Sequence, residues 1–171
     1  MLNALKRLDS LLTERKRSSV KLLIGGGGAM ILAHSYPLGT TDIDAVPKGI
    51  ESVELDLLIK IISTEQNLPF DWLNPYFATY SHTLPSDYAS RLIEVFKGEA
   101  LIALALGKEE MLIMKCFAHR QKDVGHAKAL IKGGCNQDLV FEQLETLQKK
   151  GIPGSKAALD FLEDIIDQLE A

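Results

Sequence analysis

A run of four consecutive glycines, residues 25–28, is the feature that most constrains how this chain can fold. The run follows a short apolar segment, residues 21–24, which predicts a buried strand. It precedes residues 29–33, which favour a helix that starts near Gly28. Glycine lets backbone approach a phosphate closely, and free amides at a helix start attract anions. The alternative is a tight turn that only packs the helix on the sheet, and the run alone favours neither interpretation.

Two aspartates separated by one residue, Asp42 and Asp44, lie in a second predicted strand, residues 42–46, which Pro47 closes. Alternate residues of a strand face the same side, so both carboxylates share one face and Ile43 points toward the core. Carboxylates this close repel each other unless a cation lies between them. Mg²⁺ binds through one or two carboxylates plus substrate phosphates, so the pair suits metal-assisted nucleotidyl transfer. Ordinary solvated acids are the alternative. The glycine run, which thirteen residues separate from Asp42, and Thr40 favour the metal site.

The remaining pattern predicts a small mixed sheet followed by helices, which is an α+β fold. Residues 91–106 read as a hairpin, and residues 67–85 read as an irregular segment. Helical spacing of apolar residues marks residues 2–12, 52–65, 108–120, 124–132, 137–149 and 155–169. We therefore expect one domain over residues 1–132 and a C-terminal helical extension, residues 133–171, packed on it. One compact unit is also compatible with this pattern.

Composition narrows the class of protein. The chain has 171 residues, of which 46% are hydrophobic and 25% charged, so it can bury a core of its own. A formal net charge of −4 argues against electrostatic binding of nucleic acid along the whole chain, but it is compatible with a local basic groove. The two cysteines, Cys116 and Cys135, form no C-x-x-C pair. The first residues lack a signal-peptide pattern and no apolar run could span a bilayer, which predicts a cytoplasmic protein without a membrane partner.

Two motifs carry a resemblance to a known family. Residues 26–46, GGGAMILAHSYPLGTTDIDAV, resemble the signature of nucleotidyltransferase-fold proteins of the polymerase-beta type, a glycine loop, a helix and T-x-D-[IL]-D. Residues 115–123, KCFAHRQKD, are similar to the K-x-x-A-x-R-x-K-D motif of the bacterial branch related to AbiE-type toxins of toxin–antitoxin systems. The resemblance spans roughly residues 20–132. It implies a nucleotidyltransferase-like small mixed β-sheet with flanking helices and a helical C-terminal half.

The resemblance also assigns roles to individual residues. It implies Mg²⁺, or Mn²⁺, bound by Asp42 and Asp44, and transfer of a nucleotide from an NTP to an RNA (tRNA) or protein acceptor. An antitoxin-like protein partner is implied as well. The remaining implied site residues are Gly27 and Gly28, with Thr40 nearby, for nucleotide phosphates, Lys115 for the triphosphate, and Asp123 to complete the site. The alternative for Lys115 is a lysine that extends from an apolar helix, and the alternative for Asp123 is a solvated helix end.

Three departures from the family pattern bear on activity. Leu38 stands where family members often have an arginine, and His126 stands where many relatives repeat an aspartate. The third carboxylate is open between Glu94 and Asp71. Without it, the general base for the attacking hydroxyl is weakened. A catalytically weak or inactive module that binds nucleotide or a partner protein is therefore the alternative to an active nucleotidyltransferase.

Overall fold

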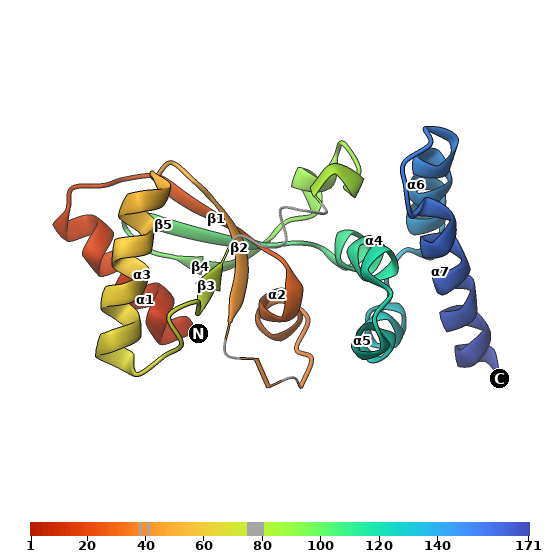
Figure 1. Ribbon diagram of the computed structural model, residues 1–171, viewed down its shortest axis with the longest axis horizontal. Coiled ribbons are helices and arrows are strands. Elements are labelled where there is room, and N and C mark those ends of the chain that lie inside the picture. Colours follow the sequence, from red (N-terminus) through yellow and green to blue (C-terminus); the bar gives the residue numbers. More distant parts are fainter. Residues whose placement is uncertain (38, 41, 75–80) are drawn as a thin grey trace. The chain divides into compact units, whose positions relative to one another are not determined.

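The structure, a computed structural model, describes residues 1–37, 39–40, 42–74 and 81–171, and the position of Leu38 lies outside them. The chain forms two compact units, a sheet unit of Met1–Ala78 with Leu92–Leu106 and a helical unit of Thr79–Arg91 with Gly107–Ala171 (Figure 1). The combination of a mixed sheet with helices confirms the predicted α+β class. The elements of the sheet unit are α1 (Leu2–Glu14), β1 (Val20–Ile24), α2 (Gly26–Leu32), β2 (Ile43–Lys48), α3 (Ser52–Gln66), β3 (Leu73–Asn74), β4 (Ile93–Lys97) and β5 (Leu101–Ala105).

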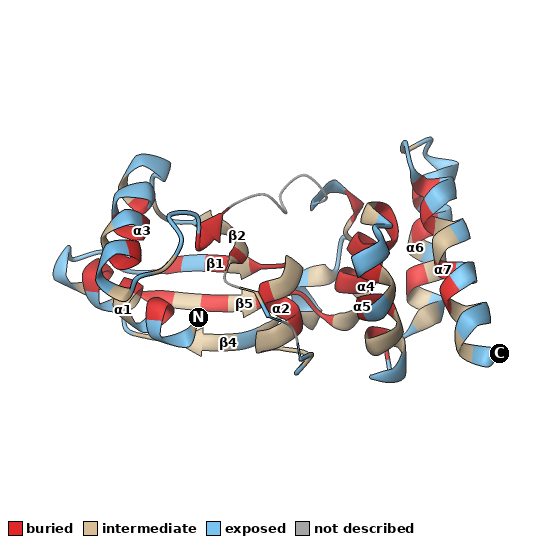
Figure 2. Cartoon of the chain, turned by 60° about the horizontal axis from the view of Figure 1, so that its bottom comes forward, coloured by how far each residue is buried: buried red, intermediate tan, exposed pale blue. Residues whose placement is uncertain are grey.

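The sheet has the strand order β3-β2-β1-β5-β4. β1 pairs antiparallel with β2 and parallel with β5, β2 pairs parallel with β3, and β4 pairs antiparallel with β5. Burial alternates along β1 and β5, as expected for strands with one covered face (Figure 2). The buried side chains of these two strands are Val20, Leu22, Ile24, Leu101, Ala103 and Ala105. Helices α1 and α3 lie side by side over this covered face (Figure 1).

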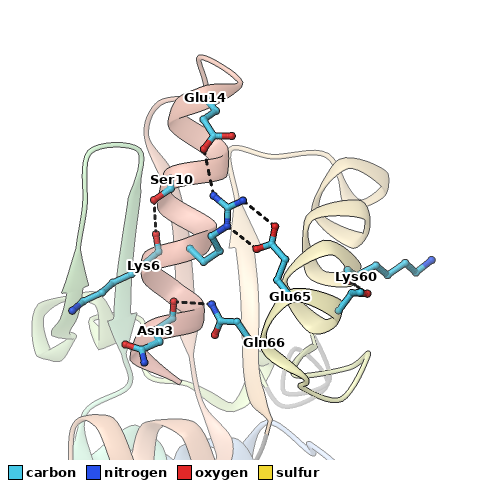
Figure 3. Close-up of polar contacts among 9 residues, drawn as sticks. Asn3, Lys6, Ser10, Glu14, Lys60, Glu65 and Gln66 are labelled. Atoms are coloured by element: carbon cyan, nitrogen blue, oxygen red, sulfur yellow. Dashed lines mark hydrogen bonds and ion pairs between the residues drawn. The ribbon is translucent and has the colours of Figure 1, made fainter.

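Two charged residues of α1 tie the helix to the rest of the sheet unit. The carboxylate of Asp9 accepts hydrogen bonds from the backbone N–H groups of Ala100, at 2.8 Å, and Leu101, at 2.9 Å. Arg7 Nε donates to Glu65 Oε2 of α3 at 2.7 Å, and Figure 3 shows the side chain of Glu65 directed toward α1. The apolar face of α1, which the leucine spacing predicted, is therefore held over both the hairpin and α3.

Pro47 lies within β2, although the sequence predicted that it would close this strand. It is the register partner of Leu22 in β1. A proline lacks an N–H group and is tolerated in a strand only where one edge is unpaired. β3 is two residues long and pairs only with Ile43 and Asp44, so the outer edge of β2 beyond Asp44 has no strand partner in β3. The short β3 therefore explains why β2 continues to Lys48.

Among its described residues, the helical unit contains the 3-10 turn η2 (Tyr88–Arg91) and the helices α4 (Lys108–Ala118), α5 (Gln121–Lys132), α6 (Gln137–Lys149) and α7 (Ser155–Glu170). α4 packs against α5, α6 and α7, and α7 contributes the buried side chains of Ala158, Leu162 and Ile165. Arg91 joins η2 to α4 through an ion pair with the fully buried Glu110, at 2.7 Å. In the described part of the chain, no helix is long and apolar enough to cross a membrane.

The division between units differs from the one that the sequence predicted. The expected boundary was residue 132, with residues 133–171 as an extension of a domain over residues 1–132. Instead, the chain passes from the sheet unit to the helical unit after Leu106. The physical reason is that α4 buries most of its surface against α5, α6 and α7, so these four helices share one core. The short-range periodicity of the sequence predicts each of these helices, but it does not reveal that α4 to α7 share a core.

Candidate functional site

The glycine turn between β1 and α2 is shaped by contact with Asp44. α2 begins at Gly26, two residues before the predicted start near Gly28. Gly26 has a left-handed backbone with φ of +56°, and a Cβ atom at this position would collide with Oδ2 of Asp44. The N–H of Gly25 donates a hydrogen bond to the backbone oxygen of Asp44 at 2.9 Å. The turn therefore requires glycine at position 26 for two reasons, the backbone angle and the space that the Asp44 carboxylate fills.

The later glycines of the run have a different environment. Gly28 is buried, and an added Cβ would lie 3.4 Å from Cγ2 of Ile24 and 3.5 Å from Cα of Ile43. Gly28 thus sets the close approach of α2 to the covered face of the sheet. Gly27 is half-buried in the first turn of α2. Gly28 therefore has a packing role, because a larger residue would separate α2 from the sheet. Gly26, by contrast, is the glycine that contacts a carboxylate.

Asp42 and Asp44 flank a core residue, as the strand spacing predicted. Ile43 is fully buried, and its N–H donates to the backbone oxygen of Trp72 at 2.7 Å. Asp42 directly precedes β2, and its Oδ1 accepts a hydrogen bond from the hydroxyl of Thr40. Both aspartates are half-buried. The structure therefore brings Thr40, Asp42, Asp44 and Gly26 into the same end of β2, around the glycine turn.

Asn74 is a residue of this region that sequence reasoning missed. In the parallel pairing of β2 with β3, Asn74 is the register partner of Asp44, so the two side chains share one face of the sheet. Asn74 is 7% exposed, and its Nδ2 donates to the backbone oxygen of Asp71 at 3.5 Å. A two-residue strand has no hydrophobic periodicity, so no signal in the sequence marks this neighbour of Asp44.

Neither Glu94 nor Asp71 is the strand neighbour of Asp44. Glu94 lies on β4, which is three strand positions from β2, or about 14 Å at the usual spacing between strands. Asp71 is exposed in the turn before β3. The sequence from Leu73 to Tyr80 contains no acidic residue. Among the residues that the structure describes, no group of three or more His, Cys, Asp or Glu side chains could hold a metal ion. The carboxylates at this end of β2 are therefore Asp42 and Asp44.

Lys115 and Asp123 contact each other inside the helical unit. Lys115 Nζ, at the end of α4, donates to Oδ1 of Asp123, near the start of α5, at 2.8 Å. Arg120 Nε donates to the other carboxylate oxygen of Asp123 at 2.7 Å, and His126 Nδ1 lies 3.6 Å from Oδ1. Asp123 is fully buried and Lys115 is 5% exposed. The two residues therefore form a buried ion pair across the α4–α5 junction. Lys115 does not extend into solvent, and Asp123 does not lie at a solvated helix end.

The environment shifts the pKa values of both partners. Burial of the Asp123 carboxylate opposes its ionisation, but the neighbouring side chains of His126, Arg120 and Lys115 outweigh burial and hold its pKa well below the usual value. Burial lowers the pKa of Lys115, and the hydrogen bond to Asp123 opposes that shift. The side chain of Arg120 is half exposed, so it is the most solvated member of this cluster.

A family comparison gives the class of protein in which these residues occur. The family described as "Nucleotidyltransferase of unknown function (DUF6036)" matches residues 2–152. The chain belongs to this nucleotidyltransferase family, because the match covers the whole sheet unit and the helical unit as far as α6. An NTP substrate and a divalent metal are general properties of this class. No curated protein and no solved structure matches the chain.

Proposed function

We propose that this chain transfers a nucleotide from an NTP to a hydroxyl group of an RNA, such as a tRNA, or of a protein, with Mg²⁺ or Mn²⁺ held by Asp42 and Asp44. The observation that carries the proposal is the position of the Asp44 carboxylate against Gly26, beside Asp42, in a member of a nucleotidyltransferase family. A glycine turn and two carboxylates at one strand end are the components that a metal–triphosphate complex needs.

The donor set fits a magnesium ion bound together with a nucleotide. Mg²⁺ prefers hard oxygen ligands in octahedral geometry and fills the positions that carboxylates leave open with phosphate oxygens and water. Asp42 and Asp44 would supply two such ligands, and the side chain of Asn74 lies on the same face of the sheet as Asp44. When bound, the ion would neutralise charge that develops on the phosphoryl group.

The proposed reaction joins the acceptor oxygen to the α-phosphorus of the NTP and breaks the bond from that phosphorus to the bridging oxygen of pyrophosphate. The hydroxyl proton must leave as the new bond forms. Asn74 can accept a hydrogen bond from the hydroxyl and orient it, but an amide does not take up the proton at neutral pH. The proton would therefore pass to solvent or to one of the two aspartates, which predicts a slow enzyme.

The other predicted site residues enter the proposal in supporting roles. Gly27, Gly28 and Thr40 would contact the phosphates of the nucleotide, as the family resemblance implies. Lys115 and Asp123 are proposed to add positive charge and order to the triphosphate site, but their mutual ion pair equally supports a purely structural role. Unfolding of a Lys115→Met variant, together with its affinity for ATP and adenosine, separates these two interpretations.

The more specific assignment is to the bacterial branch related to AbiE-type toxins, in which this chain would be a toxin held in check by an antitoxin-like protein. It rests on the motif of residues 115–123. An adjacent reading frame for a small helix-turn-helix protein would support this assignment.

A second candidate function is a module that binds nucleotide or a partner protein without turnover. The observation that favours it is Asn74, an amide where a carboxylate beside Asp44 could act as a general base. Binding of a metal–nucleotide complex needs only the two aspartates and the glycine turn. The two functions therefore share a ligand and differ in whether a new phosphoester bond forms.

Calorimetry with each of the four NTPs in the presence of Mg²⁺ tests the shared binding step. We expect the Asp42→Asn/Asp44→Asn variant to lose most of the metal-dependent affinity. The matched control is Asp56→Asn/Glu99→Gln, which removes two exposed carboxylates of the same unit and should bind as the wild type does. Equal affinity of the wild type and the Asp42/Asp44 variant would overturn both functions.

Incorporation of label from α-labelled NTPs into a cell extract tests turnover. The wild type should label an RNA or a protein with at least one NTP, in the presence of Mg²⁺ or Mn²⁺, and the Asp42→Asn/Asp44→Asn variant should not. If both label the extract equally under every condition while nucleotide binding persists in the wild type, the enzymatic function is wrong. The binding module would then be the better description.

A further inference from the structure

Three lysines form a row across the sheet face opposite to α1 and α3. Lys21 of β1 is the register partner of Lys48 of β2 and of Ile102 of β5, and Ile102 is in turn the partner of Lys97 of β4. Register partners point to the same face, so the row runs from Lys48 through Lys21 and Ile102 to Lys97. All three lysines are exposed, and we call them the lysine row.

The lysine row is not explained by ion pairing or by stability. In the described part of the chain, no carboxylate lies within 4.0 Å of the ammonium group of Lys21, Lys48 or Lys97. Side chains directly opposite each other in an antiparallel pair have their Cβ atoms about 5 Å apart, and like charges there destabilise the sheet. Lys21 and Lys48 form such a pair. In a chain of net charge −4, the three lysines are a local concentration of positive charge, which favours contact with a polyanion.

The lysine row shares its face of the sheet with Asp44. Asp44, Val46 and Lys48 alternate along β2, so all three point to one side. Asp44 and Lys48 are four residues apart, or about 13 Å along the strand. The positions between them on this face carry the half-buried apolar side chains of Val46, Leu23 and Leu104, which are register partners of one another. An apolar strip thus connects the basic end of the face to the carboxylate end.

We propose that this face binds a single-stranded segment of RNA, with its phosphates at the lysine row and its terminal hydroxyl directed toward Asp44. This inference rests on the proposed nucleotide transfer and names its acceptor class. The sheet faces of several protein modules bind single-stranded RNA, and aromatic side chains on those faces stack on the bases. No aromatic side chain occupies the strip of Val46, Leu23 and Leu104. Lysines that contact phosphates without stacking aromatics give binding with little sequence preference.

The charge distribution favours RNA over an acceptor protein. A protein acceptor would need apolar anchors or paired charges at the contact. Three exposed lysines, which have no ion-pair partner among the described residues, instead suit the repeated phosphates of a nucleic-acid strand. Glu94 is the exposed acid on this face, as the register partner of Leu104. Glu94 lies on the edge strand β4, away from β2. Among the described residues of β1 and β2, no acidic side chain between Lys48 and Asp44 on this face would therefore repel the RNA phosphates.

Fluorescence anisotropy with a labelled single-stranded RNA of mixed sequence, titrated at several salt concentrations, tests this proposal without NTP. Each phosphate contact contributes about 0.7 to the slope of log affinity against log salt for a single strand. The Lys21→Gln/Lys48→Gln/Lys97→Gln variant should therefore have a slope smaller by about 2. Its affinity should be roughly 400-fold lower at 0.05 M salt, if the affinities converge near 1 M salt.

The matched control removes three other exposed lysines, in Lys6→Gln/Lys60→Gln/Lys150→Gln. Figure 3 shows Lys6 and Lys60 extending to opposite sides of the α1–α3 pair. The control has the same net charge as the test variant and should keep the wild-type slope. If the control loses as much affinity as the test variant, or the test variant loses none, the proposal is overturned. It is also overturned if the wild type binds no RNA, or binds single-stranded DNA of the same sequence more tightly.

Two further measurements separate this proposal from the proposed function. The lysine-row variant should bind the Mg²⁺–NTP complex as the wild type does, because none of the three lysines belongs to the metal or nucleotide site. Conversely, Asp42→Asn/Asp44→Asn should still bind the RNA probe. If the wild type binds no nucleotide but its RNA binding depends on the lysine row, the proposed function is wrong and the RNA-binding surface is supported. If the reverse is observed, the transfer reaction uses another acceptor.

Discussion

Replacing Lys115 by methionine is the sharpest test of what the buried α4–α5 ion pair does. Methionine keeps the length and apolar contacts of the lysine stem but removes the ammonium group. Asp123 would then stay buried with its Oδ1 no longer accepting from Nζ, although Arg120 and His126 remain beside it. We expect Lys115→Met to destabilise the helical unit, because the carboxylate loses its most deeply buried cationic partner.

The size of the effect follows from burial. Removing one partner of a buried pair costs about 3–5 kcal/mol, and the remaining contacts of Asp123 with Arg120 and His126 place this pair near the lower limit. About 3 kcal/mol corresponds to a fall in Tm of roughly 6–12 °C for a chain of this size. The exposed pair Lys149–Glu145, at 3.3 Å, is the natural comparison. Breaking it with Lys149→Met should cost about 0.3–0.5 kcal/mol, or roughly 1–2 °C.

Thermal and urea unfolding of the wild type, Lys115→Met, Lys149→Met and Lys115→Met/Asp123→Leu provides the measurement. The double variant removes both buried charges and should be more stable than the sum of the two single substitutions predicts. Affinity for ATP, ADP and adenosine should be measured on the same proteins. A lysine that serves only the triphosphate would leave Tm unchanged and weaken ATP binding far more than adenosine binding. That result would refute the structural interpretation of the Lys115–Asp123 pair.

Two further predictions concern the glycine turn and acid stability. Gly26→Ala should cost about 1–2 kcal/mol of folding free energy from the left-handed backbone and should also displace the Asp44 carboxylate. Calorimetry should therefore show weaker metal-dependent nucleotide binding. Gly39→Ala, where an added Cβ meets no atom of the described residues within 4 Å, should behave as the wild type does. The lowered pKa of Asp123 contributes stability above about pH 3.9, the value for an unfolded aspartate, and this contribution is lost as the pH falls toward the folded-state pKa. Unfolding curves from pH 7 to pH 2 should show a smaller acid-induced fall in Tm for Asp123→Asn than for the wild type, and parallel curves would contradict the assignment.

The sequence by itself determined most of the secondary structure. The leucine spacing of α1, the apolar segment before the glycine run and the helical periods of α4 to α7 each predicted an element that the structure contains. These signals are local, because a strand or a helix face repeats every two or about 3.6 residues within one short window. The same local rule predicted that Ile43 enters the core between Asp42 and Asp44.

Only the tertiary structure decided which elements share a core and which side chains meet. The two-residue strand β3 carries no periodic signal, yet it makes Asn74 the neighbour of Asp44. The lysine row depends on the register of four strands that are scattered between residues 20 and 105. Lys115 and Asp123 looked like independent site residues, but the turn between α4 and α5 buries them as a pair. Such contacts arise from long-range packing, which the hydrophobic period of a single segment does not encode.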